Sequence, residues 1–311
     1  MRKFDVIMPL AEKDIASVWT RMVYFKKYLP MKKLVIIGNK KVIDIMKKKY
    51  PDKMIELIDE DTILKLTDVK DVMKRVSSND EAAIKRSGWY LQQFLKMLYA
   101  EICEDEYYLA WDSDTLPLIT VNMIKDDKPV FHMKDEYYVP YFETMNKLIG
   151  INKINKKSFI AEHMLFNCNI MKTLIREIES NMQLQGEKFY EKILYAIDKK
   201  ELSQSGFSEF ETYGTFCDLR YPNKYIKEDW YSLREGSKYF VDEQFGEREA
   251  KWVRKQYMAI SFEKSMQLLP EHKLYKNRLV QLIPFEKVKV EYRRYLRNKI
   301  RRIVRNLFGQ K

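Results

Sequence analysis

The first half of the chain alternates short apolar runs with longer amphipathic segments. Four runs are typical of strands: residues 4–8, 34–37, 54–58 and 107–111. Three segments between them are typical of helices: residues 15–28, 42–49 and 82–101. Strands and helices that alternate with short links favour a mostly parallel sheet with right-handed crossovers. We therefore expect an α/β fold whose ligand binds beyond the carboxyl ends of the strands.

The fourth apolar run, YYLAW, leads directly into Asp112-Ser113-Asp114, and Pro117 then ends the pattern. An aromatic-rich run of five residues predicts a strand that is buried on both faces. Two carboxylates one residue apart at its exit suit a hard divalent cation that shares the phosphate oxygens of a nucleotide. Asp and Ser are also common turn formers, so a polar turn is the alternative interpretation of this tripeptide.

The second half is less regular and richer in aromatic residues. Residues 130–133 and 163–167 are typical of strands, and residues 171–182 and 187–199 are typical of helices. Ser208 and Glu211 have the spacing of a capping box, which predicts the start of a further helix.

Composition sets broad limits on the protein. With 311 residues, 46% of them hydrophobic, the chain can bury a large core. Its three cysteines lie far apart in apolar surroundings, which favours core thiols in a reducing compartment over a disulfide framework or a zinc site. The start is too short in its apolar part for a signal peptide, and no apolar run approaches the ~20 residues that cross a bilayer. We expect a cytoplasmic protein, peripheral at the inner face of the cell membrane.

The net charge of +12 is concentrated at the C-terminus, where residues 291–311 hold six Arg, two Lys and one Glu, a local net charge of +7. Apolar residues recur there at mostly three- and four-residue steps, which predicts a basic amphipathic helix over 291–308 that binds an anionic membrane surface. Packing of that helix on the domain and contact with RNA are the alternatives. Because the body of the chain carries little excess charge, nucleic acid is not an expected partner.

Several segments resemble one family. The strand that ends in WDSDT resembles the DxD motif of nucleotide-sugar-dependent glycosyltransferases with the GT-A fold. The helix at 86–100 resembles the one before the DxD strand in bacterial enzymes of capsule or cell-surface polysaccharide synthesis. HMLFN at 163–167 and GFSEFETYG at 206–214 resemble segments on the acceptor side. The likeness spans most of residues 1–265, and it implies a GT-A-like sheet flanked by helices in a single domain with a C-terminal amphipathic helix.

The resemblance also implies roles for particular residues. Asp114 is the expected direct ligand of Mn²⁺ or Mg²⁺, with Asp112 contacting the ribose or binding the metal through water. Gln92 and Lys96 lie one helical turn apart, and Arg86 stands at a helix start, where backbone N–H groups favour an anion. The expected donor-binding residues are Pro9, Arg86, Gln92, Gln93, Lys96, Asp112 and His163.

An inverting transferase also needs a base for the acceptor hydroxyl, and Glu209 and Glu211 are the candidates. If Glu211 closes the capping box, Glu209 is left to face the substrate, so Glu209 is the first choice and Glu211 the second. A retaining enzyme needs neither residue in that role. The acidic cluster Asp59-Glu60-Asp61 at another strand exit is expected either to contact a nucleoside or to form a solvated loop.

The resulting hypothesis is a metal-dependent glycosyltransferase that moves a sugar from a nucleotide-sugar donor, a UDP-sugar first of all, to a saccharide or lipid-linked acceptor in surface polysaccharide synthesis. Residues 1–265 form the transferase domain, with a nucleotide-binding half at 1–128 and an acceptor half at 129–265, and residues 266–311 form an extension. The alternatives are a related nucleotidyl or phosphoryl transferase, and a non-enzymatic basic protein that binds membrane or nucleic acid. No P-loop pattern is present, which disfavours the first alternative.

Overall fold

The computed structural model describes the backbone of residues 2–308 and the side chains of residues 2–295 and 298. The chain divides into two compact units. Unit 1 comprises residues 1–115 and 120–230, and unit 2 comprises residues 116–119 and 231–311. The division expected at residue 265 stays a prediction.

A five-stranded sheet forms the centre of unit 1. Its strands, in spatial order, are β3 (Ile55–Asp59), β2 (Met31–Gly38), β1 (Phe4–Pro9), β4 (Tyr107–Trp111) and β8 (His163–Asn167). The first four are parallel, and β8 pairs with β4 in the antiparallel sense. Every residue of β1, β4 and β8 is buried, as expected for strands covered on both faces. The expected α/β class with a mostly parallel sheet flanked by helices is confirmed.

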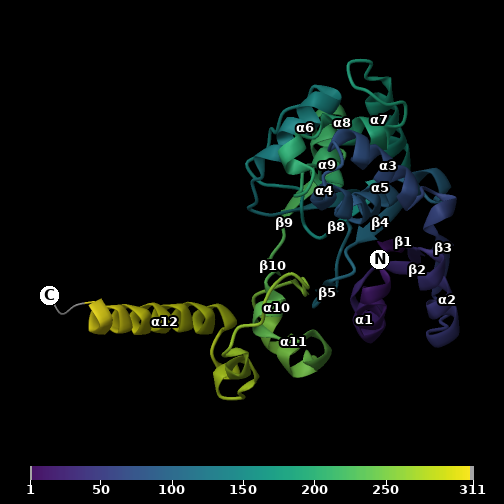
Figure 1. The fold of residues 1–311 in the computed structure, drawn as a ribbon. Coiled ribbons are helices and arrows are strands. Elements are labelled where there is room, and N and C mark those ends of the chain that lie inside the picture. Colours follow the sequence, from purple (N-terminus) through teal and green to yellow (C-terminus); the bar gives the residue numbers. More distant parts are fainter. Residues whose placement is uncertain (1, 309–311) are drawn as a thin grey trace. The chain divides into compact units, whose positions relative to one another are not determined.

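The order of the strands creates a topological switch point between β1 and β4. The chain winds outward from β1 through β2 to β3 and then returns to place β4 on the other side of β1. Because the crossovers are right-handed, the two directions of winding put their helices on opposite faces of the sheet. Figure 1 shows α1 (Ile15–Tyr28) and α2 (Lys40–Lys49) on one face, with α3 (Leu66–Val76) and α5 (Ser87–Ile102) on the other. Open sheets of this kind bind ligands at the switch point.

The remaining elements of unit 1 complete the second half of the domain. They are helices α4 (Glu81–Lys85), α6 (Val139–Ile149), α7 (Cys168–Ser180), α8 (Phe189–Ala196) and α9 (Glu209–Arg220), and a small sheet of β6 (Ile124–Lys125), β7 (Lys128–Met133) and β9 (Ile226–Asp229).

Local capping explains several helix starts. Asn39 accepts a hydrogen bond from the backbone N–H of Val42 and caps α2, and Ser208 accepts one from Glu211 and caps α9. The single helix expected over 82–101 is two helices, because the chain turns at Arg86 between α4 and α5. The sequence patterns did not predict α3 and α6, whereas α1 and β8 have the expected bounds.

Unit 2 holds a short sheet of β10 (Ser232–Leu233), β11 (Ala259–Ser261) and β5 (Thr115–Pro117), the last of which begins at the final residue of the preceding unit 1 segment. Its helices are α10 (Gly236–Tyr239), α11 (Glu247–Val253) and α12 (Phe285–Phe308). Its core is aromatic, and its buried rings include those of Tyr239, Phe240, Trp252, Tyr275 and Phe285.

The helix predicted over 291–308 is present as the later part of α12. Most side chains of the apolar and basic faces expected there are outside the described residues. Residues 309–311 are also outside the described part of the chain. No helix in the part of the chain that the structure describes is long and apolar enough to cross a membrane.

Candidate active site

A cavity of about 390 Å³ opens beyond the carboxyl ends of β1, β2 and β3. Its walls come from the exits of these strands and from the start of α5. The lining residues are Pro9, Leu10, Ala11, Lys13, Asn39, Glu60, Leu66, Lys85, Arg86, Gly88, Trp89, Leu91 and Gln92. The cavity therefore lies at the sheet edge where an open α/β fold binds its ligand.

Hydrogen bonds hold Arg86 in place in the wall of this cavity. Its Nε donates to the carbonyl of Gln204 at 2.7 Å, its Nη2 donates to Ser205 Oγ at 3.1 Å, and its guanidinium lies 4.2 Å from the ring centroid of Trp89. Burial lowers the pKa of Arg86, although an arginine remains charged at neutral pH. The structure thus places a fixed positive charge beside the cavity, at the helix start where the sequence predicted an anion contact.

The segment Asp112-Ser113-Asp114 is a hydrogen-bonded turn at the exit of β4. The backbone N–H of Thr115 donates to the carbonyl of Asp112 at 3.1 Å, and Arg21 on α1 donates to the carbonyl of Ser113 at 2.6 Å. Asp112 and Asp114 are both partly exposed, and Asp114 Oδ1 accepts from Thr115 Oγ1 at 3.1 Å. The segment is a turn, as in the alternative interpretation, and it also presents two carboxylates.

A buried lysine joins this turn to α9. Lys96 Nζ donates to Asp112 Oδ1 at 2.6 Å and to Glu209 Oε1 at 2.8 Å. The side chains of Lys96 and Glu209 are 9% and 4% exposed, whereas that of Asp112 is 33% exposed. Gln93 Oε1, on the same helix as Lys96, accepts from the backbone N–H of Glu209 at 3.2 Å. We call Lys96, Asp112 and Glu209 the charge triad.

Burial and charge act against each other within the triad. Burial disfavours the ammonium, but the neighbouring carboxylates of Asp112 and Glu209 outweigh it and raise the pKa of Lys96 above its ordinary value. Burial also raises the pKa of Glu209, with a contribution from Asp112, although Lys96 opposes the shift. Lys96 is therefore a permanent cation at neutral pH, held beside one open and one enclosed carboxylate.

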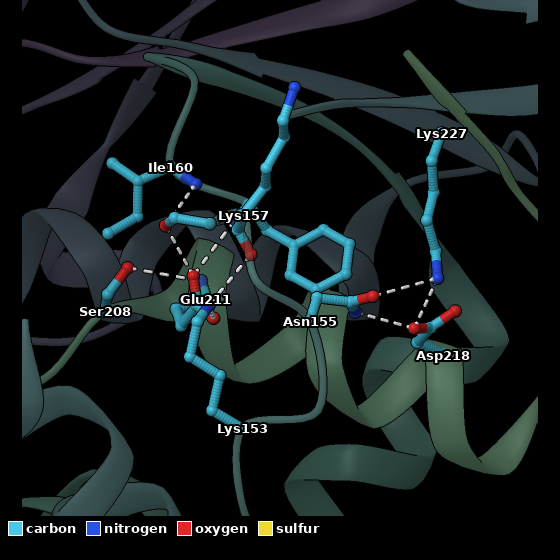
Figure 2. Close-up of polar contacts among 10 residues, drawn as sticks. Lys153, Asn155, Lys157, Ile160, Ser208, Glu211, Asp218 and Lys227 are labelled. Carbon is cyan, nitrogen blue, oxygen red and sulfur yellow. Dashed lines mark hydrogen bonds and ion pairs between the residues drawn. The ribbon is translucent and has the colours of Figure 1, made fainter. Parts of the chain in front are cut away.

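The other candidate base, Glu211, belongs to a separate network, shown in Figure 2. Its Oε1 accepts from Lys153 Nζ at 2.8 Å, and its Oε2 accepts from Ser158 Oγ at 2.6 Å and from the backbone N–H of Phe159 at 3.0 Å. The side chains of Glu211 and Lys153 are 1% and 5% exposed. Only half of the expected capping box forms: Ser208 caps α9, but the carboxylate of Glu211 ties the 153–160 loop to this helix.

A second polar cluster in Figure 2 fastens the same loop further along α9. Asp218 Oδ2 accepts from Asn155 Nδ2 at 2.7 Å and from Lys227 Nζ at 2.5 Å. The 153–160 loop is thus anchored to α9 at two places one above the other on the helix. The polar side chains in Figure 2 therefore hold this loop in position against α9.

His163 lies beneath the turn in an aromatic enclosure. Its ring stacks on Trp111 at 4.7 Å and contacts Trp230, and its Nε2 lies 2.7 Å from Nδ1 of His132. Burial lowers the pKa of His132 to about 4, and burial together with His132 lowers the pKa of His163. Two neutral rings can share one hydrogen bond. His163 is 2% exposed, and its expected role in donor binding stays a prediction.

Glu162 supports the turn from a strained backbone conformation that sequence reasoning missed. This buried residue has a φ of 60°, which is unfavourable for a side chain of its size. Its carboxylate accepts from Lys134 Nζ at 2.5 Å and from Trp230 Nε1 at 3.1 Å. Its carbonyl accepts from the backbone N–H of Asp112 at 2.9 Å. Strained residues of this kind concentrate at functional sites.

The structure sorts the residues predicted from sequence into three groups. Pro9, Arg86 and Gln92 line the cavity, and Gln93, Lys96, Asp112 and Glu209 meet at the triad. The cavity and the triad are adjacent along α5, because Gln92 in the cavity wall and Lys96 in the triad lie one turn apart on this helix. His163 and Glu211 lie in other networks. Among cavity residues, Asn39 could have been found from its place at a strand exit, but Lys13 and Trp89 carry no such signal.

The donor set at the turn fits a divalent cation that is bound together with a substrate. Among the residues that the structure describes, no group of three or more His, Cys, Asp or Glu side chains could hold a metal. Asp112 and Asp114 offer two partly exposed carboxylates, and Asp112 Oδ2 accepts no hydrogen bond from a described residue. Mg²⁺ commonly uses one or two carboxylates and completes its shell with water and substrate phosphates.

The fold and the site define an α/β protein with a cavity beyond the carboxyl ends of β1, β2 and β3. The chain belongs to a family of unknown function, DUF6492, whose model matches residues 1–273. No curated protein matches the chain.

Three solved structures are similar to the chain at low identity. Mouse xyloside xylosyltransferase 1 in its apo form is 12% identical, with 86% of this chain and 100% of that chain covered and a TM-score of 0.43. The galactosyltransferase LgtC, in complex with donor and acceptor sugar analogs, is 9% identical, with 91% and 98% covered and a TM-score of 0.41. The bifunctional glycosyltransferase WbbM is 11% identical, with 94% and 52% covered and a TM-score of 0.41. At these TM-scores the likeness carries no conclusion about function.

Glu211→Gln is expected to destabilise unit 1 by about 3 kcal/mol, because it leaves the Lys153 ammonium buried without its carboxylate. Urea unfolding measures the change. Asp198→Asn is the matched control, since it breaks an ion pair with Lys147 in which both side chains are about two-fifths exposed, and it should cost less than about 1 kcal/mol. Equal losses in the two variants would contradict a structural role for Glu211.

Glu60 is expected to make stability fall as pH rises from about 4.5 to about 7. Burial, with help from Asp61 and Asp59, raises the pKa of Glu60 to about 7 from its ordinary 4.5. The folded state holds this proton more tightly than the unfolded chain does. The resulting contribution to the free energy of unfolding is therefore complete below pH 4.5 and is lost as the pH rises through about 7. Glu60→Gln keeps the side chain neutral and removes this dependence.

Thermal unfolding midpoints at several pH values check this expectation. The difference between the unfolding midpoint of Glu60→Gln and that of wild type should be near zero at pH 4.5 and should rise until pH 7 is passed. Glu81→Gln, at a glutamate whose side chain is 89% exposed, is the control and should show no such trend. A constant offset for Glu60→Gln across this range would refute the shift.

Proposed function

We propose that the protein transfers a sugar from a nucleotide-sugar donor to an acceptor hydroxyl. The observation that carries this proposal is the stripe of α5 that runs from the cavity to the charge triad. Gly88, Trp89 and Gln92 line the cavity, and Lys96 follows one turn later in contact with Asp112 and Glu209. One rigid helix thus contributes to the wall of the cavity with its first turns and to the charge triad near its middle.

The donor half of the proposal rests on the charge around the cavity. A nucleotide sugar leaves a nucleoside diphosphate, so negative charge grows on the β-phosphate as the sugar–oxygen bond breaks. Arg86 and Lys13 are cationic side chains of the cavity wall, and the first turn of α5 adds backbone N–H groups that favour an anion. These groups would bind the diphosphate and stabilise it as it leaves.

Asp112 and Asp114 would hold Mn²⁺ or Mg²⁺ on the diphosphate. The cation would supply Lewis-acid stabilisation of the leaving group when it is bound. Lys96 neutralises one oxygen of Asp112 and keeps that carboxylate in place. Glu162 and Arg21 hold the backbone of the turn, so both aspartates are oriented before substrate arrives.

Glu209 is the proposed base on the acceptor side. It would take the proton of the acceptor hydroxyl while the acceptor oxygen bonds to the anomeric carbon and the nucleoside diphosphate departs. Burial raises the pKa of Glu209, which favours uptake of a proton by this carboxylate. Glu209 is enclosed and paired with Lys96, so this role requires the pair to open when substrate binds. Glu211, which is fully engaged in the loop network, is the weaker candidate.

The finer proposals follow from the motif resemblance. The donor is a UDP-sugar, the acceptor is a saccharide or a lipid-linked saccharide, and the product belongs to surface polysaccharide synthesis. The protein then works at the inner face of the cell membrane, where the basic helix over 291–308 meets anionic lipid.

Nucleotide and metal together are expected to raise the thermal unfolding midpoint. At a concentration of UDP with Mn²⁺ about 100 times the dissociation constant, the stabilisation should reach about 2.7 kcal/mol. Asp114→Ala should lose the part that depends on metal, and Asp71→Ala, at an exposed aspartate on α3, should keep it. The absence of a shift with UDP, GDP or CMP would contradict the proposal.

A further variant, Glu209→Gln, separates binding of the nucleotide from transfer of the sugar. Glu209→Gln should keep the shift with nucleotide and metal but transfer sugar about 100- to 10,000-fold more slowly if Glu209 is the base. Release of free sugar from a nucleotide sugar distinguishes a glycosyltransferase from a nucleotidyl transferase, which would release a sugar phosphate.

The terminal helix is expected to draw the protein to anionic vesicles. Deletion of residues 291–311 removes a net charge of +7 and should reduce flotation with vesicles that contain phosphatidylglycerol, with a smaller effect at high salt. Equal flotation of both forms would reject a membrane role for this segment.

A further inference from the structure

We propose that unit 2 carries a second membrane contact, a groove that binds the phosphate headgroup of an anionic lipid beside two leucines that enter the bilayer surface. The groove has a volume of about 260 Å³ and is lined by Arg248, Lys251, Trp252, Lys255, Arg278, Gln281 and Leu282. It belongs to unit 2 alone and precedes α12 in the sequence. This inference does not depend on the proposed reaction.

The floor and walls of the groove are held in place by hydrogen bonds. Trp252, which is 3% exposed, donates from its Nε1 to the carbonyl of Ile283 at 2.8 Å. Arg248 Nη2 donates to the carbonyl of Lys276 at 3.2 Å. Gln281 Nε2 donates to the carbonyl of Tyr275 at 2.8 Å. These hydrogen bonds hold α11 and the 276–283 segment together as one concave surface.

Four cations surround this surface. Arg248, Lys251, Lys255 and Arg278 are all exposed. Arg248 pairs with Glu249 at 2.7 Å, whereas the other three make no ion pair with any residue that the structure describes. Glu249, which pairs with Arg248, also accepts a hydrogen bond from Gln281 of the lining at 3.5 Å. The groove thus presents about three uncompensated positive charges, a match for a phosphate diester at a lipid surface.

Apolar side chains stand beside the cations. Leu279 and Leu282 are 74% and 78% exposed, and Ile283 is 43% exposed. Exposure of such apolar side chains to water is unfavourable, whereas the headgroup region of a bilayer accommodates leucine next to basic residues. Basic and exposed apolar groups around one groove favour a lipid surface over a nucleic acid, whose phosphates call for cations alone.

The charge of unit 2 supports the same partner. Residues 231–311 hold 20 basic and nine acidic residues, a net charge of +11 out of the +12 of the whole chain. The basic helix over 291–308 accounts for only part of this excess. Unit 1 is nearly neutral, so attraction to an anionic membrane acts on unit 2.

The test compares full-length variants in flotation with phosphatidylcholine vesicles, with and without phosphatidylglycerol. Lys251→Gln/Lys255→Gln/Arg278→Gln should bind the anionic vesicles about 100-fold more weakly than wild type. Lys47→Gln/Lys48→Gln/Lys49→Gln is the matched control, because it removes three exposed charges from α2 in unit 1, and it should bind as wild type does. Thermal unfolding midpoints measured without vesicles should be the same in all three proteins.

Two results would overturn the proposal: wild-type binding by the groove variant, or an equal loss in the α2 control. Leu279→Ser/Leu282→Ser gives an independent arm that keeps every charge. It should weaken binding to anionic vesicles even at high salt, where the electrostatic part is screened. Hydrogen exchange should also show that anionic vesicles protect residues 276–283 in wild type, and exchange that vesicles leave unchanged there would refute insertion of this segment.

Discussion

The site depends on one buried interaction, the contact of the Lys96 ammonium with both Asp112 and Glu209. It joins three elements that are separate in sequence: helix α5, which lines the cavity, the exit of β4 and the start of α9. A buried ion pair adds little net stability, but the loss of one partner leaves an uncompensated charge that is costly. The triad therefore fixes the mutual positions of these elements more than it contributes to folding, and a site that must hold reacting groups in place needs this property.

The sheet supplies the other constraint. The strand order reverses between β1 and β4, and open sheets with such a reversal bind ligands beyond the carboxyl ends of their strands. The same reversal puts α5 on the opposite face from α1 and α2, so α5 can reach both the cavity and the exit of β4. Glu162, whose backbone is strained, and the hydrogen-bonded His132–His163 pair are all buried.

The two candidate bases show how far sequence reasoning reached at the site. Glu209 and Glu211 are two residues apart and chemically equal, and the capping pattern at Ser208 correctly predicted the start of α9. The pattern wrongly predicted the partner of Glu211, which binds Lys153 and Ser158 from a loop some 50 residues earlier. Local spacing cannot show that contact, because it arises only when the loop folds across the helix.

The sequence by itself determined the α/β class, the parallel strands and the presence of two carboxylates at the exit of a buried strand. These features depend on apolar periodicity and on short-range capping, which neighbouring residues specify. The tertiary structure decided that Lys96 joins Asp112 to Glu209, that Glu162 holds the turn, and that the basic groove of unit 2 adjoins exposed leucines. Each of these arrangements brings together side chains from separate segments, and only the packing of those segments determines which charges meet.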